Sequence, residues 1–132
     1  KVVYAPDGLR FAGATMDYSA VYRLRAVLQW WPTIGLGVEN KHTYIQQRQQ
    51  DFLDALSSLS HPLLNDKYRL FEGWERQGHF ITYALKPEQA KELHLALKAK
   101  NIETDYRNGR LRFGFAIYHD TDDYNALSLL AV

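Results

Sequence analysis

The stretch from Ile102 to His119 constrains the fold more than any other part of the chain, because its pattern predicts a β-hairpin. Asn108-Gly109 is a strong turn signal, since a type I′ turn needs a positive φ at both central residues. A two-residue turn fixes which residues face one another across the hairpin. The expected pairs are Arg107 with Arg110, Tyr106 with Leu111, Asp105 with Arg112, and Thr104 with Phe113.

The alternation of side chains along a strand divides the hairpin into two faces. One face is apolar enough to be buried and comprises Ile102, Thr104, Tyr106, Leu111, Phe113, Phe115 and Ile117. The other face comprises Glu103, Asp105, Arg112, Gly114, Ala116 and Tyr118. Because this second face carries one cation among small residues, Arg112 is the candidate functional residue of the hairpin.

The remaining chain predicts helices and strands in a definite order. Apolar residues at helical spacing predict one helix from Tyr18 to Trp31, with Thr15 or Asp17 as its cap, and a second from Val38 to Leu59. Further on, the pattern predicts a short strand at 68–71, a strand at 79–85, a helix from Pro87 and a short helix after Asp120.

This order predicts an α+β fold: two long N-terminal helices, then an antiparallel sheet of three or four strands with helices on one face. A chain of 132 residues is long enough for one domain with one core. We expect 1–132 to form a single domain, with a helical pair or linker over 1–60 and the α+β layer over 61–132. The seam between these parts is expected near 61–67.

Composition narrows the classes of function. A net charge of +1 gives no electrostatic reason to expect binding to nucleic acid or to an anionic membrane. No apolar run reaches transmembrane length, and no signal peptide is recognisable. The chain contains no cysteine, so it has neither disulfides nor a thiolate nucleophile, and we expect a cytoplasmic protein. Because the chain begins at Lys1, we expect a fragment or a processed product.

The common catalytic and metal-binding motifs are not found. The sequence has no glycine-rich phosphate loop, no HExxH and no GxSxG, and its five histidines lack metal-ligand spacing. His42 and His94 are expected to be packed or surface residues. The acidic run at Asp120, Asp122 and Asp123 lies at a predicted helix start, where capping explains it better than a metal site does.

Two interpretations of Arg112 remain open from spacing alone. The first is a cross-strand ion pair with Asp105, and exposed pairs of this kind contribute about 0–1 kcal/mol. The second is a carboxylate-binding site, because a guanidinium binds a carboxylate through two parallel N–H groups.

The segment LRFGFAIYHDTDDYNALSLL resembles the C-terminal segment of class V, fold type I, pyridoxal-phosphate enzymes. That family includes aminotransferases, cysteine desulfurases, selenocysteine lyases and kynureninases. The similar pattern is Leu111-Arg112-Phe113-Gly114, followed by Tyr118-His119-Asp120-Thr121 and an acidic helix start, with His119 where the family has Asn and Asp120 as an extra residue. The resemblance implies that Arg112 binds the α-carboxylate of an amino-acid substrate, with Tyr118 and His119 close by.

The segment LRFAGATMD resembles a second stretch of the same family, although Gly13 and Ala14 depart from its Ala-Gly order. This resemblance implies that Thr15 contacts the phosphate of pyridoxal 5′-phosphate in the neighbouring subunit, and therefore that the full-length enzyme is a homodimer. The family's cofactor-binding lysine and the aspartate that pairs with the pyridine nitrogen lie upstream, and no stretch here matches them.

The resemblance therefore implies the small, C-terminal domain of a pyridoxal-phosphate-dependent aminotransferase-like enzyme. This chain would supply no catalytic residue and would be inactive alone. The family's desulfurases use a cysteine thiol in this region, and this chain has no cysteine, so a thiol-dependent cysteine desulfurase is not expected. An aminotransferase is preferred, followed by a lyase that needs no enzyme thiol. The alternative is a free-standing α+β domain for protein interaction or ligand binding, in which Arg112 only pairs with Asp105.

Overall fold

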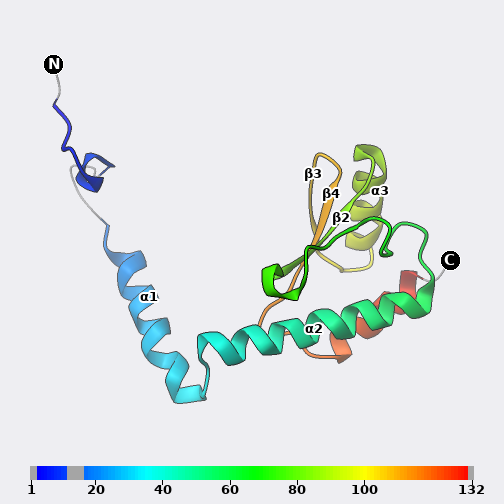
Figure 1. The fold of residues 1–132 in the computed structure, drawn as a ribbon, viewed down its shortest axis with the longest axis horizontal. Coiled ribbons are helices and arrows are strands. Elements are labelled where there is room, and N and C mark those ends of the chain that lie inside the picture. The colour runs from blue at the N-terminus through cyan, green and yellow to red at the C-terminus, as the bar shows by residue number, and fades with distance from the viewer. Residues whose placement is uncertain (1–2, 12–16, 131–132) are drawn as a thin grey trace. The chain divides into compact units, whose positions relative to one another are not determined.

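The computed structural model describes residues 3–11 and 17–130, and its contacts divide the chain into two compact units, Lys1–Gly37 and Val38–Val132 (Figure 1). We expected a division near 61–67. The structure instead places the helix Val38–Leu59 in the same unit as the sheet, because its apolar stripe is buried there. Among the described residues, none of the helices is both long enough and apolar enough to cross a membrane.

The first unit contains the predicted helix as α1, Ser19–Trp30. The backbone N–H of Ser19 donates to the Asp17 carboxylate at 2.8 Å, and this carboxylate has a lowered pKa because the Ser19 hydroxyl and N–H both hydrogen-bond to it. The N-cap position is Tyr18, whose side chain makes no capping hydrogen bond, so Asp17 binds the Ser19 N–H from one residue before the cap. Thr15, the other predicted cap, lies outside the described residues. The short 3-10 helices η1, Gly8–Phe11, and η2, Trp31–Ile34, flank α1.

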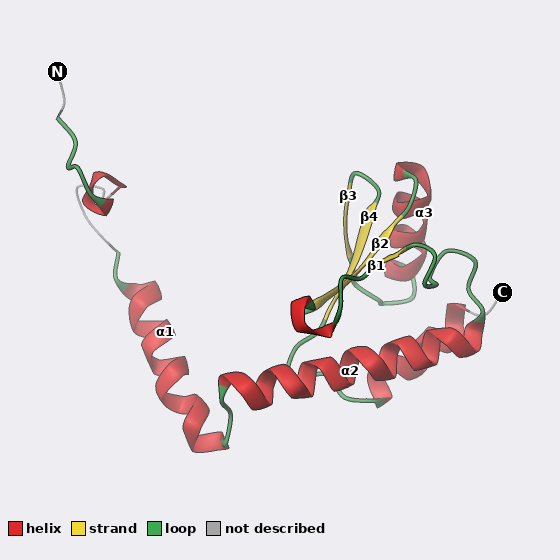
Figure 2. Ribbon diagram, viewed as in Figure 1, coloured by secondary structure: helices red, strands yellow, loops and turns green. Residues whose placement is uncertain are grey.

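The second unit is an α+β fold with one four-stranded antiparallel sheet (Figure 2). The strands are β1 (Arg69–Leu70), β2 (Phe80–Ala84), β3 (Asp105–Arg107) and β4 (Arg110–Gly114), in the spatial order β1-β2-β4-β3. The helices are α2 (Val38–Leu59) and α3 (Pro87–Lys98), with the 3-10 helices η3 (Trp74–Arg76) and η4 (Asp122–Leu130). These bounds lie close to the predicted ones, and the sheet has the larger of the two expected strand numbers.

The hairpin turn has the predicted register. Arg107 pairs with Arg110, Tyr106 with Leu111 and Asp105 with Arg112. Asn108 and Gly109 have φ values of 46° and 78°, as the turn requires. The ladder ends at Asp105, so the expected pair between Thr104 and Phe113 does not form; the Thr104 hydroxyl lies 2.8 Å from His94 Nδ1 instead.

Alternate residues of β2 and β4 form the side of the hydrophobic core that the sheet contributes. Ile81, Tyr83, Leu111 and Phe113 are buried, and residues of α2 and α3 belong to the same apolar cluster. The Phe52 ring of α2 lies 4.9 Å from the Phe113 ring. Packing of α3 on the sheet agrees with the prediction of helices on one face, whereas α2 was expected to pair with the preceding helix and belongs to this cluster instead. Ile117 was expected in the core but is exposed, because β4 ends at Gly114.

The intervening residues of the strands form the opposite side of the sheet, which we call the open face. It comprises Leu70, Phe80, Thr82, Ala84, Asp105, Arg107, Arg110, Arg112 and Gly114, which the register places on the same side. Leu70, Phe80 and Arg110 are exposed, and Arg112 is half-buried.

Candidate functional site

Arg112 lies in the middle of β4 on the open face. Its strand neighbours are Thr82 on β2 and Asp105 on β3. Its Nη2 donates to Asp105 Oδ2, and its Cζ lies 5.7 Å from the centroid of the Phe80 ring. The Arg112 side chain is 31% exposed, and its Nε is buried without a hydrogen-bond partner in the described part of the chain. Asp105 thus holds one side of the guanidinium in place, while not every N–H group of the guanidinium has a hydrogen-bond partner among the described residues.

A hollow of about 520 Å³ opens beside Arg112. Tyr118 and His119, the residues expected near the arginine, line it together with Phe80, Gly114 and Phe115. The Tyr118 side chain is largely solvent-exposed, whereas His119 is fixed: its Nδ1 accepts the Ala116 N–H at 3.2 Å. The Tyr44 hydroxyl of α2 donates to the His119 carbonyl at 2.6 Å, which ties this loop to the helix. Glu103 and Asp105 also line the hollow, and Asp105 already pairs with Arg112. The hollow therefore offers one cationic donor beside aromatic surface and two carboxylates, and a small organic carboxylate would bind there by sharing the guanidinium with Asp105.

A second hollow of about 380 Å³ lies on the other side of Arg112, toward the hairpin turn. Arg107, Arg110 and Arg112 line it together with Leu70 and Thr82. The Arg107 Nε lies 3.5 Å from Asp105 Oδ1, so Asp105 interacts with two of the three arginines. The expectation that Arg112 is the one cation on this face is therefore wrong, because the register places Arg107 and Arg110 on the same side.

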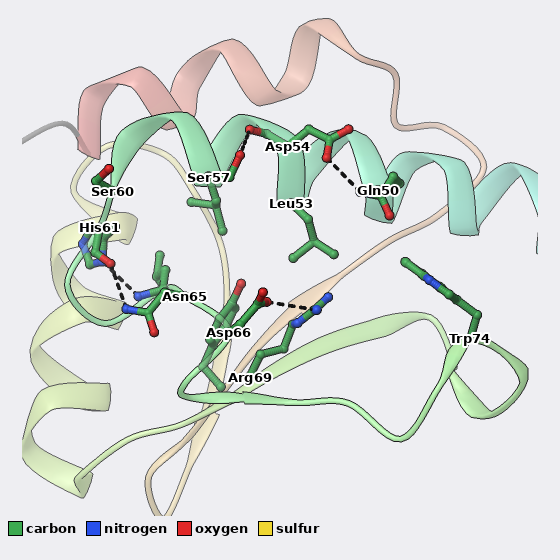
Figure 3. A pocket seen from close by; sticks show the side chains of 13 residues that line it. Gln50, Leu53, Asp54, Ser57, Ser60, His61, Asn65, Asp66, Arg69 and Trp74 are labelled. Carbon is green, nitrogen blue, oxygen red and sulfur yellow. Dashed lines mark hydrogen bonds and ion pairs between the residues drawn. The ribbon is translucent and has the colours of Figure 1, made fainter.

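A third hollow, of about 320 Å³, lies between the C-terminal half of α2 and the segment that leads into β1 (Figure 3). Several of its polar groups bind one another: Arg69 pairs with Asp66 at 2.9 Å, and Asn65 donates to the His61 carbonyl at 3.1 Å. As at Arg112, the Nε of Arg69 is buried without a hydrogen-bond partner among the described residues. His61 Nδ1 accepts the N–H groups of Leu63 and Leu64 at 3.2 and 3.1 Å, and burial lowers the pKa of this imidazole. This hollow shares no lining residue with the two at Arg112, and its hydrogen bonds organise the loop after α2.

The acidic run before η4 caps that helix, as predicted. Asp120 Oδ1 accepts the N–H groups of Asp122 and Asp123 at 2.9 and 3.3 Å, and Asp123 Oδ2 accepts the Asp120 N–H at 2.8 Å. Within the described ranges no group of three or more His, Cys, Asp or Glu side chains could hold a metal ion. His94 packs against the Tyr106 ring at 4.9 Å, and the His42 and His79 rings lie 6.5 Å apart.

Of the two residues that the family resemblance singles out for binding, the structure places Arg112 in a hollow, whereas Thr15 lies outside the described residues. No protein-family model, curated protein or solved structure matches the chain.

Proposed function

We propose that this chain is the C-terminal, small-domain part of a class V pyridoxal-phosphate-dependent aminotransferase-like enzyme, in which Arg112 binds the α-carboxylate of an amino-acid substrate. The observation that carries the proposal is the position of Arg112. It stands on an open sheet face, is held by Asp105, and lines a hollow of about 520 Å³ with Tyr118 and His119. These are the residues that the resemblance associates with the substrate carboxylate. In this proposal the full-length enzyme is a cytoplasmic homodimer.

The contribution of Arg112 would be to orient the substrate. Asp105 engages Nη2, which limits rotation of the side chain, and Nε is buried, so a carboxylate would bind at the Nη end of the guanidinium. A planar guanidinium that is already oriented loses less rotamer entropy when it binds. The Phe80 ring lies beside Cζ, but Phe80 and Tyr118 are themselves exposed, so in this proposal other parts of the full-length enzyme exclude water from the charge-assisted contact.

The hollow at Arg112 fits a carboxylate better than it fits the cofactor. Lysine is not among the residues that line it, so this hollow would not hold pyridoxal phosphate covalently. The cofactor, when bound in the full-length enzyme, supplies the electron sink for chemistry at the substrate's α-carbon. In this proposal its lysine belongs to another part of the enzyme, and the present residues bind and position the carboxylate.

The first prediction concerns Arg112→Ala in the full-length enzyme. Losing a charge-assisted, bidentate partner in a desolvated site is expected to weaken kcat/KM for amino acids by about 2–5 kcal/mol. Amines that lack a carboxylate should be spared, and Arg112→Lys should recover only part of the loss, because an ammonium lacks the planar fork. Steady-state kinetics with matched amino acids and amines measures this difference.

Arg76→Ala is the matched control, because Arg76 is an exposed arginine on η3 that pairs with Glu72 at 3.3 Å. It should leave both kinds of substrate unchanged. An equal loss for amino acids and amines in Arg112→Ala would show that Arg112 is a structural residue.

A free-standing α+β domain for ligand binding or protein interaction is the second candidate, and the ion pair between Arg112 and Asp105 favours it. In that case the arginine serves the fold, and its removal costs about 0–1 kcal/mol of stability. The parent reading frame separates the two candidates. An upstream domain of roughly 200 or more residues with the cofactor lysine supports the enzyme, and its absence supports the binding domain.

A further inference from the structure

The open face concentrates positive charge at the hairpin end of the sheet. Arg107 and Arg110 are direct partners in the ladder, and Arg112 follows two residues after Arg110 on the same side of β4. Like charges directly opposite one another in a sheet are destabilising. The described ion pairs of this face join Asp105 to Arg107 and to Arg112, and neither involves Arg110. Three guanidinium groups thus face one carboxylate, which leaves two uncompensated positive charges.

These arginines also share a concave surface. Arg107, Arg110 and Arg112 line the hollow of about 380 Å³, with the hydroxyl-bearing Thr82 and the apolar Leu70 beside them. Alternate residues of a strand lie about 7 Å apart, so Arg110 and Arg112 can each bind a different end of one small ligand. Arg112 lines this hollow and the larger one, and therefore connects them.

We propose that Arg107 and Arg110 bind a second anionic group beside Arg112, so that this face takes a dicarboxylate: an amino acid with an acidic side chain, or the corresponding oxo acid. The inference rests on the proposed carboxylate site at Arg112 and adds the substrate class. The two uncompensated positive charges match the two negative charges of a dicarboxylate. The pair with Asp105 keeps Arg112 in position for the first carboxylate, while Arg110, which forms no ion pair with a described residue, takes the second carboxylate.

The test uses the 132-residue chain and compares glutarate with butyrate at constant ionic strength. Ligands that bind only the folded state raise the unfolding temperature in a saturable manner. Glutarate should do so and should shift the amide resonances of β3 and β4, whereas butyrate should bind about tenfold or more weakly, since it has one carboxylate instead of two. Equal responses to the two acids, or no response to glutarate, would overturn the proposal.

Arg110→Gln provides the decisive variant. It should abolish the preference for glutarate, and it should leave the unfolding temperature without ligand unchanged or higher, because it removes a like-charge contact. Arg23→Gln on the exposed helix α1 is the matched control and should preserve the preference. A preference that survives Arg110→Gln, or a response to inorganic phosphate as strong as that to glutarate, would exclude a dicarboxylate site.

The failure of this inference is distinguishable from failure of the proposed function. If the glutarate preference is missing while Arg112→Ala still discriminates amino acids from amines in the full-length enzyme, the carboxylate site stands and the dicarboxylate specificity is wrong. If Arg112→Ala fails to discriminate, the proposed function itself is wrong.

Discussion

Gly109 shows how one residue fixes the position of Arg112. Its φ is 78°, and its carbonyl accepts the Leu85 N–H at 2.8 Å, which joins the hairpin turn to the chain after β2. A Cβ at this position would meet the Leu85 carbonyl oxygen well inside van der Waals distance. Because the neighbour is backbone rather than a flexible side chain, the turn would have to shift.

We therefore predict that Gly109→Ala destabilises the chain by about 1–3 kcal/mol, from the strained φ together with the clash. Urea denaturation measures the change. Gly78→Ala is the control, since an added Cβ there has no neighbour within 4 Å and its φ lies outside the positive range, so it should change stability by much less. If the two variants are equally stable, the turn tolerates a side chain at Gly109.

His61 predicts a dependence of stability on pH. Its Nδ1 accepts two backbone N–H groups and must stay unprotonated to do so, and burial holds its pKa below the ordinary value of 6.5. Just below that pH, His61 is protonated in the unfolded chain but stays neutral in the folded chain. This contribution to stability is therefore fully present above about pH 6.5 and declines as the pH falls toward the folded pKa.

His61→Asn keeps a side-chain acceptor but cannot titrate. We expect the variant to lose less stability than the wild type between pH 7 and pH 5, both followed by denaturation at each pH. His79 also has a pKa lowered by burial and by Lys41, and it stays in both proteins, so the difference between the two curves isolates His61. Parallel curves would show that His61 does not couple folding to protonation.

At the residue scale, the sequence predicts side-chain partners where a turn fixes the register. The Arg112–Asp105 pair and the capping role of Asp120 followed from spacing alone, because a two-residue turn and a helix start leave few alternatives. The role of His61 could not be predicted, since its acceptor contacts depend on the path of the loop after α2. The hollow that joins Arg112 to Tyr118 and His119 likewise depends on how the chain bends after Gly114.

At the element scale, α2 shows the limit of a helical pattern. Spacing predicted an apolar stripe on this helix, and its members Ile45, Phe52 and Leu56 are buried. Of the two end members of the stripe, Leu59 is half-buried and Val38 is exposed. The pattern does not tell which surface this stripe packs on. The order of the elements predicts that α2 pairs with the preceding helix, whereas its aromatic contacts join it to the sheet and to η4.

Phe52 is the centre of this packing. Its ring lies 4.9 Å from Phe113, 5.3 Å from Phe115 and 5.9 Å from Tyr124. We predict that Phe52→Ala costs about 3–5 kcal/mol of unfolding free energy, through lost burial and the cavity that remains. Leu28→Ala on α1 is the control and should stay within about 0.5 kcal/mol, because the Leu28 side chain is exposed. A loss below about 1 kcal/mol for Phe52→Ala would mean that α2 is not anchored through this ring.

At the scale of the whole molecule, the α+β class and the antiparallel sheet followed from the order of the predicted elements, whereas the unit boundary at Gly37 did not. The boundary depends on which elements share a core. In the described part of the chain, the buried hydrophobic residues all lie between Ile45 and Leu127. None of the residues of α1 is buried, although its sequence is apolar at helical spacing.

A chain that starts at Val38 should therefore fold by itself. Removing residues 1–37 takes away no buried hydrophobic residue of the described core, so we expect the truncated chain to retain a cooperative unfolding transition with a midpoint close to that of the full chain. It should also keep the amide resonance pattern of the sheet and, if the arginine hollow binds as proposed, the preference for glutarate. Thermal denaturation and NMR of both chains make the comparison. The truncated chain could instead unfold without cooperativity, or its unfolding midpoint could lie several degrees below that of the full chain. Either result would show that the first unit contributes to the stability of the second.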